Sequence, residues 1–181
     1  MTTVRFRSFL TILILLQIGR LVGQITYVCL NNSTCGCSTN SAILSKIVGG
    51  ETASNGTWNW IVSIRLKRTN SHICGGSIIS DSHILTAAHC TVPYIFPSLL
   101  RIYIGSIYVD SAAQIRDVSQ IFNHQFYSAI DYLNDISILK LSTPLNFDQI
   151  GIGKICLPNI SSNILEIDEY PSPGINVIIA A

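Results

Sequence analysis

Between residues 60 and 141 the chain alternates short apolar stretches with polar turn residues. The stretches are rich in β-branched side chains and are bounded by Gly, Pro, Asn, Asp or Ser, a pattern typical of β-strands. No long stretch has the 3.6-residue apolar spacing of an amphipathic helix. We therefore predict an all-β fold, an antiparallel barrel or sandwich. The predicted strands cover residues 60–66, 73–79, 83–87, 99–104, 115–122 and 136–141.

The N-terminus has the pattern of a secretory signal. Arg5 and Arg7 precede an apolar run at residues 9–18, and the small residue Gly23 suits a cleavage position. The run is too short to cross a bilayer, although an uncleaved membrane anchor is the alternative. We predict that residues 1–23 are a signal peptide and that the protein is secreted and extracellular, with no membrane contact after the signal is removed.

The net charge limits the kinds of partner that the chain can be expected to bind, and the cysteines bear on the compartment in which it folds. The chain has 11 Lys+Arg and 10 Asp+Glu, a net charge of +1, so nothing favours a nucleic-acid or anionic-membrane partner. In a secreted protein the six cysteines are disulfide candidates before they are metal ligands. Glycosylation sequons give weak further support for secretion, and they begin at Asn31, Asn32, Asn55 and Asn159.

Two stretches carry candidate catalytic chemistry. Residues 85–90 read Leu-Thr-Ala-Ala-His-Cys, and an imidazole such as that of His89 has an ordinary pKa of about 6.5, which suits it to take a proton from a hydroxyl nucleophile. Residues 134–141 read Asn-Asp-Ile-Ser-Ile-Leu-Lys-Leu, which places Asp135 directly before an apolar strand. We expect its carboxylate to be buried.

Further motifs lie on either side of these two stretches. Residues 46–50 read Lys-Ile-Val-Gly-Gly, residues 74–79 read Cys-Gly-Gly-Ser-Ile-Ile, and residues 155–158 read Ile-Cys-Leu-Pro. In this order the motifs resemble those of the chymotrypsin-like (trypsin-like) serine endopeptidases, over roughly residues 47–177. The resemblance implies a fold of two six-stranded antiparallel barrels, of which this chain supplies the first. It also implies hydrolysis of peptide bonds in a polypeptide substrate, with no metal or cofactor.

The resemblance also implies roles for individual residues. His89 is the expected general base and then acid, and Asp135 accepts a hydrogen bond from Nδ1–H of His89, which selects the tautomer. Cleavage after Lys46 by an activating trypsin-like protease would free the amine of Ile47, as in a zymogen. Residues 24–46 are then a propeptide segment.

Cysteine pairing follows from the same resemblance. A bond that closes the histidine loop should stabilise the fold by about 3 kcal/mol, and a bond to the propeptide would keep that segment attached after activation. The implied pairs are Cys74–Cys90, Cys37–Cys156 and Cys29–Cys35.

A zinc site is the alternative use of some of these side chains. It would combine Cys74, His83, His89 and Cys90, but their spacing matches no common zinc pattern. We therefore expect no metal.

The nucleophile of the family does not occur in the sequence. Family members need a serine in the context Gly-Asp-Ser-Gly-Gly, which is absent here. Ser161, Ser162 and Ser172 lack the flanking glycines that let a turn present two N–H donors to an oxyanion. Residues 174–181 read as the opening of another strand, so we expect the protease domain at 47–181 to be truncated, its second barrel largely missing, and the chain inactive. The alternative is a non-catalytic, secreted, protease-like binding module.

Overall fold

The structure is a computed structural model that describes residues 34–38, 53–108 and 111–158. No helix among these residues is long and apolar enough to cross a membrane. Several predictions concern residues outside the described ranges: the signal at 1–23, the Lys46–Ile47 cleavage site, Cys29, the serines at 161, 162 and 172, and the strand expected at 174–181.

Six strands form where the apolar pattern predicts them, and no observed end differs from its predicted position by more than one residue. Each strand is therefore specified locally, by β-branched residues between turn residues. The strands are β1 (Ile61–Leu66), β2 (His72–Ile78), β3 (His83–Thr86), β4 (Leu100–Ile104), β5 (Gln114–Asn123) and β6 (Ser137–Leu141).

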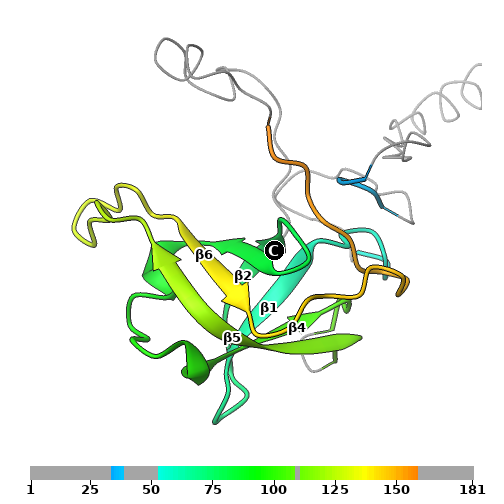
Figure 1. Ribbon diagram of the computed structural model, residues 1–181, viewed down its shortest axis with the longest axis horizontal. Coiled ribbons are helices and arrows are strands. Elements are labelled where there is room, and N and C mark those ends of the chain that lie inside the picture. The colour runs from blue at the N-terminus through cyan, green and yellow to red at the C-terminus, as the bar shows by residue number, and fades with distance from the viewer. Residues whose placement is uncertain (1–33, 39–52, 109–110, 159–181) are drawn as a thin grey trace, which may run out of the picture.

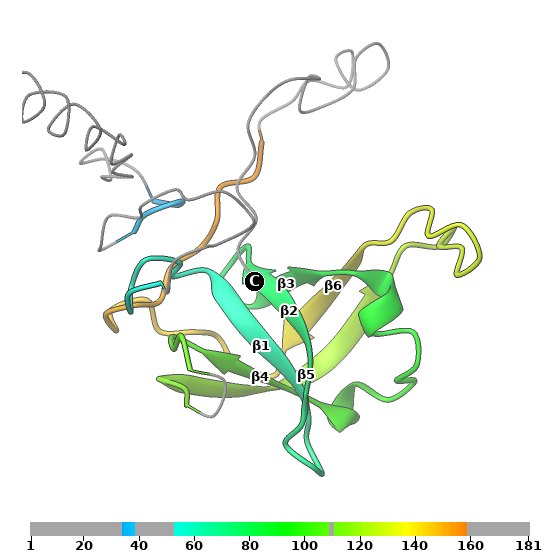
Figure 2. The same ribbon diagram turned by 180° about the vertical axis from the view of Figure 1, so that it is seen from behind.

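The strands form a closed antiparallel barrel in the order β1-β2-β3-β6-β5-β4 (Figure 1, and from behind in Figure 2). β4 closes the barrel by pairing with β1, where Ile64 lies opposite Ile102. β6 pairs with both β3 and β5, so Ser137 lies opposite Thr86 on one side and Asn123 on the other. The predicted all-β barrel is confirmed, and closure leaves no free edge in this sheet.

The barrel interior is apolar because alternate residues of each strand point inward. Burial of one such side chain contributes about 1.5–3 kcal/mol. The residues with 0% exposure on these strands are Ile64, Ile78, Ile84, Leu100, Ile102 and Leu139.

A disulfide ties residues 34–38 to the segment that follows the barrel, and it differs from the predicted one. It joins Cys156 to Cys35, so the predictions of Cys37–Cys156 and Cys29–Cys35 pairs are wrong. Cys37 is also disulfide-bonded, and its partner lies outside the described residues. The structure contains the expected bond between Cys74 and Cys90.

The geometry of Gly36 explains this pairing. In an extended chain Cys35 and Cys37 would point to the same side, but Gly36 has a φ of +66°, in the left-handed region, and turns the chain between them. Gly36 N–H donates to the carbonyl oxygen of Lys154 at 2.7 Å. A Cβ at position 36 would lie only 3.1 Å from Cys156 Sγ, so the turn requires glycine.

Candidate active site

His89 lies in a short 3-10 helix, η1 (Ala88–Cys90), directly after β3. Its two neighbours in this turn are buried, and Cys90 is bonded to Cys74 of β2. The His89 side chain is 50% exposed. Small buried residues on both sides therefore anchor the turn and leave the imidazole at the surface.

Asp135 contacts His89 at two points. Its Oδ1 accepts a hydrogen bond from the backbone N–H of His89 at 2.8 Å, and its Oδ2 lies 2.7 Å from Nδ1 of the same residue. Asp135 is two residues before β6, which pairs with β3, so the barrel brings together residues that are 46 positions apart. A two-point contact fixes the direction of the ring as well as its distance.

The Asp135 carboxylate is less buried than the sequence analysis expects. Its side chain is 22% exposed, because Asp135 precedes β6 at the end of the barrel and does not point into the core. Only from Ser137 onward do alternate residues of this segment become buried.

Hydrogen bonding keeps Asp135 ionised. The side chain of His89 lowers the pKa of this carboxyl below its ordinary value of 3.8, and the backbone N–H of His89 lowers it further, against a smaller opposing effect of desolvation. An ionised carboxylate can accept hydrogen bonds but cannot donate them. The Nδ1 atom beside it must therefore be the donor, so the neutral imidazole carries its proton on Nδ1. Nε2 is then free of a proton and can act as a base.

Nε2 of His89 lies 3.3 Å from Cys90 Sγ. A disulfide sulfur has no hydrogen, and Nε2 has none in the tautomer that Asp135 selects, so this is a packing contact between two acceptors. The disulfide thus forms one wall beside the base. The ring of Tyr132 lies edge-on to the imidazole, with 6.2 Å between ring centroids.

The possible metal ligands near His89 are occupied. Ligand atoms of Cys74, His89 and Cys90 lie within 4.8 Å of one another. Both sulfurs belong to the disulfide, and zinc binds the thiolate form of cysteine. His83, the fourth residue of the zinc alternative, is not in the group, and its Nδ1 lies 2.9 Å from Ser80 Oγ.

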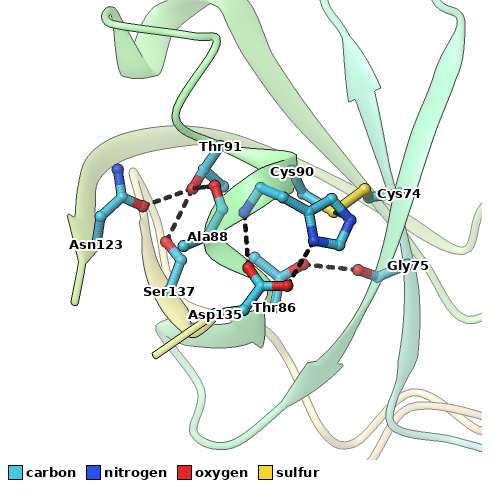
Figure 3. Close-up of a disulfide and its surroundings, with 10 residues drawn as sticks. Cys74, Gly75, Thr86, Ala88, Cys90, Thr91, Asn123, Asp135 and Ser137 are labelled. Atoms are coloured by element: carbon cyan, nitrogen blue, oxygen red, sulfur yellow. Dashed lines mark hydrogen bonds and ion pairs between the residues drawn. A yellow bond between two sulfur atoms is a disulfide. The ribbon is translucent and has the colours of Figure 1, made fainter. Parts of the chain in front are cut away.

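A buried polar contact beneath His89 was not found by sequence analysis. Thr91 follows η1, and its hydroxyl lies close to Asn123 of β5 and Ser137 of β6 (Figure 3). Thr91 is 0% and Ser137 is 1% exposed. Nothing in the sequence distinguishes these residues from surface polar ones, since the contact depends on how η1 and two strands meet.

The loop between β5 and β6 presents apolar side chains next to this site. Tyr132 and Asn134 have left-handed backbone angles, with φ of +53° and +55°. Asn134 Nδ2 donates to the carbonyl oxygen of Phe126 at 2.9 Å, which closes the loop on itself. The exposed large apolar residues of this loop are Phe126, Ile130, Tyr132, Leu133 and Ile136.

The other described histidines hydrogen-bond neither His89 nor Asp135 among the described residues. His72 of β2 hydrogen-bonds Ser63 of the neighbouring strand β1, His83 hydrogen-bonds Ser80 in the turn before β3, and His124 accepts from the backbone N–H of Phe126. No serine hydroxyl among the described residues hydrogen-bonds Nε2 of His89, so within those residues the site consists of a base and its carboxylate.

Comparison with known protein families gives a match that agrees with this geometry. The family model described as Trypsin matches residues 47–169, well over half of the chain. The matched range includes the whole barrel, with His89 and Asp135.

Proposed function

Because this chain belongs to the trypsin family of serine peptidases, we propose that His89 is its general base and that Asp135 orients that base. Family membership implies a polypeptide substrate. The observation that carries the proposal is the two-point contact of Asp135 with Nδ1 and the backbone N–H of His89. That contact leaves Nε2 unprotonated, on a side chain that is 50% exposed, as a base for a hydroxyl nucleophile requires.

In the proposed reaction a serine hydroxyl attacks the carbonyl carbon of a peptide bond while Nε2 of His89 accepts the hydroxyl proton. Asp135 stays ionised and stabilises the imidazolium that forms. His89 then gives the proton to the leaving amine, which departs and leaves an acyl-enzyme. Water then attacks the acyl carbon while His89 accepts one of its protons, and His89 gives that proton to the serine oxygen as the acyl–oxygen bond breaks and the acid is released.

The nucleophile in this proposal comes from residues other than the 181 printed ones. The context Gly-Asp-Ser-Gly-Gly does not occur among them. We therefore expect the 181-residue chain by itself not to hydrolyse peptide bonds, although it carries the base and the orienting carboxylate.

Activation and secretion belong to the same proposal. The sequence Lys46-Ile47 supports cleavage by a trypsin-like activator, and the apolar run at residues 9–18 supports secretion. The Cys35–Cys156 bond, which joins positions on either side of Lys46, would then keep the N-terminal segment attached. This bond also supports an oxidising compartment.

A binding module is the second candidate function, and one observation favours it. The first barrel is closed by itself, with all six strands paired on both sides and a core of residues at 0% exposure. Such a barrel can be stable without further strands. A chain of this kind would bind a partner and cleave nothing.

Fluorophosphonate labelling of the natural protein tests the proposal. The protein would be captured with an antibody against residues 53–158, treated with a trypsin-like activator, labelled, and mapped by mass spectrometry. We expect a labelled serine on the chain that carries those residues. In the recombinant form of that chain, His89→Ala should abolish labelling, whereas the control His72→Ala, at an exposed position on β2, should not.

The opposite result is a captured protein that consists of the 181 residues alone and takes up no label. The peptidase proposal would then fail for this protein, and the binding module would be the favoured function.

A further inference from the structure

We infer that Thr91 is a positioning residue for the His89–Asp135 pair and acts through a buried hydroxyl contact between η1, β5 and β6. The inference rests on the proposed function of that pair. Neither the family match nor the catalytic motifs point to Thr91, whose hydroxyl hydrogen-bonds neither ring nitrogen of His89. It acts through the backbone that carries the two catalytic side chains.

The contact involves four oxygens (Figure 3). Thr91 Oγ1 lies 2.5 Å from Asn123 Oδ1, 3.1 Å from the carbonyl oxygen of Ala88 and 3.2 Å from Ser137 Oγ. These oxygens come from the end of β5, the first residue of η1 and the first residue of β6. One hydroxyl therefore joins three separate segments at one end of the barrel.

The hydrogen-bonding capacity of the Thr91 hydroxyl determines which of these oxygens it can bond. The Thr91 hydroxyl has one proton, which it donates toward all three of these oxygens. Asn123 Oδ1 is the nearest acceptor, and the carbonyl oxygen of Ala88 and Ser137 Oγ accept from the same hydroxyl at longer distances. At 0% and 1% exposure, neither hydroxyl can turn to water instead.

The position of Thr91 links this contact to the catalytic pair. Thr91 is two residues after His89, and its backbone N–H closes η1 by donating to the carbonyl oxygen of Ala88 at 3.0 Å. Ser137 is two residues after Asp135 and begins β6. The Thr91–Ser137 contact thus holds together the two backbone stretches that present the imidazole and the carboxylate.

The exposed pair needs such support. His89 is 50% and Asp135 is 22% exposed, and a solvent-exposed ion pair contributes little free energy, so buried contacts of the adjoining backbone are needed to keep the two side chains together. The Cys74–Cys90 bond anchors η1 to β2 on one side. Thr91 anchors it on the other side, toward the strand that follows Asp135.

Measurement of the His89 tautomer tests the inference. Long-range proton–nitrogen NMR spectra of the full 181-residue chain report the ratio of Nδ1–H to Nε2–H forms at alkaline pH, where the imidazole is neutral. In the wild-type chain we expect Nδ1–H to dominate. In Thr91→Val, which keeps the shape and removes the hydroxyl, we expect this ratio to fall about fivefold, as for the loss of one ordinary hydrogen bond.

Two further variants separate positioning from packing. Thr91→Ser keeps the hydroxyl and loses the methyl group, so it should restore the wild-type ratio. Thr57→Val removes another buried threonine hydroxyl, one at 2% exposure with no hydrogen-bond partner in the described part of the chain, and it should leave the ratio unchanged.

Two results would overturn the inference. One is a folded Thr91→Val chain with the wild-type tautomer ratio. The other is a Thr91→Ser chain that changes as much as Thr91→Val, which would mean that the methyl group matters and the hydroxyl does not. If Thr91→Val does not fold, Ser137→Ala removes the other hydroxyl and must lower the ratio for the inference to stand. Because the readout needs neither nucleophile nor hydrolysis, its outcome is independent of the labelling experiment.

Discussion

Asp135 holds His89 by both of its carboxylate oxygens, Oδ1 at 2.8 Å from the backbone nitrogen and Oδ2 at 2.7 Å from Nδ1. The backbone contact fixes where the turn lies, and the side-chain contact fixes which nitrogen of the ring carries the proton.

The acidity of Asp135 depends on His89. The His89 side chain is the largest cause that lowers the pKa of this carboxyl below 3.8, so His89→Ala should raise the Asp135 pKa toward its ordinary value. Carboxyl carbon chemical shifts followed over an acid titration measure it. Asp117, whose pKa is lowered by other residues, serves as the internal control and should titrate as before. An Asp135 pKa that does not move in His89→Ala would contradict the structural assignment.

Asp117 should make stability depend on pH. Lys67 Nζ lies 2.7 Å from its Oδ2 and Arg101 Nε lies 2.9 Å from its Oδ1, and these hydrogen bonds, with Lys67 first, lower the Asp117 pKa below 3.8. Because the pKa of Asp117 is lower in the folded state than in the unfolded state, its ion pairs stabilise the fold above about pH 3.8. That stabilisation is lost as the pH falls through the pKa of Asp117 in the folded state.

Urea unfolding of Asp117→Asn measures this effect. Near neutral pH we expect a loss of less than about 1 kcal/mol, because both ion pairs are solvent-exposed, and the loss should shrink as the pH falls through the lowered pKa of Asp117 in the folded state. Asp148→Asn removes an exposed carboxylate that has no ion pair among the described residues and should show no such dependence. An Asp117→Asn deficit that persists in acid would mean that the effect is not electrostatic.

The Cys35–Cys156 bond should keep the N-terminal segment attached after cleavage at Lys46. Under non-reducing conditions the cleaved wild-type chain should keep its full mass, and cleaved Cys156→Ser should release the segment. Cys37→Ser should retain it, because Cys156 is bonded to Cys35. Intact mass spectrometry before and after reduction gives the answer. If cleaved Cys37→Ser released the N-terminal segment and cleaved Cys35→Ser retained it, the Cys37–Cys156 bond expected from the family resemblance would be the correct one.

Gly76 should tolerate no side chain, whereas its neighbour Gly75 should. A Cβ at position 76 would lie 2.9 Å from Ile84 Cγ2 and 3.0 Å from the carbonyl oxygen of Leu85, where β2 approaches β3. At position 75 the nearest atom would be 3.9 Å away. Overpacking of this kind costs about 1–3 kcal/mol, so Gly76→Ala should lower the free energy of unfolding by that amount.

Thermal and urea unfolding of Gly76→Ala and Gly75→Ala make a matched comparison, since both changes add one methyl group to the same strand. Equal losses in the two variants would show that the cost comes from the glycine backbone and not from crowding against β3.

The sequence by itself determined the strands and singled out the motifs that contain His89 and Asp135. Strand positions follow from alternation of β-branched and polar residues between turn formers, which acts over a few neighbouring positions, and all six strands were predicted to within one residue at each end. The resemblance singled out His89 and Asp135, and their local contexts, a small-residue turn and the start of an apolar strand, are visible in the sequence.

Only the tertiary structure decided which distant groups meet. Cys35 bonds Cys156 because a left-handed turn at Gly36 separates it from Cys37, and sequence spacing does not reveal that turn's direction. The Thr91 hydroxyl reaches Ser137 because η1 folds over the ends of β5 and β6. Contacts of this kind depend on how the closed barrel brings strand ends together, and closure is a property of the whole sheet and not of any one segment.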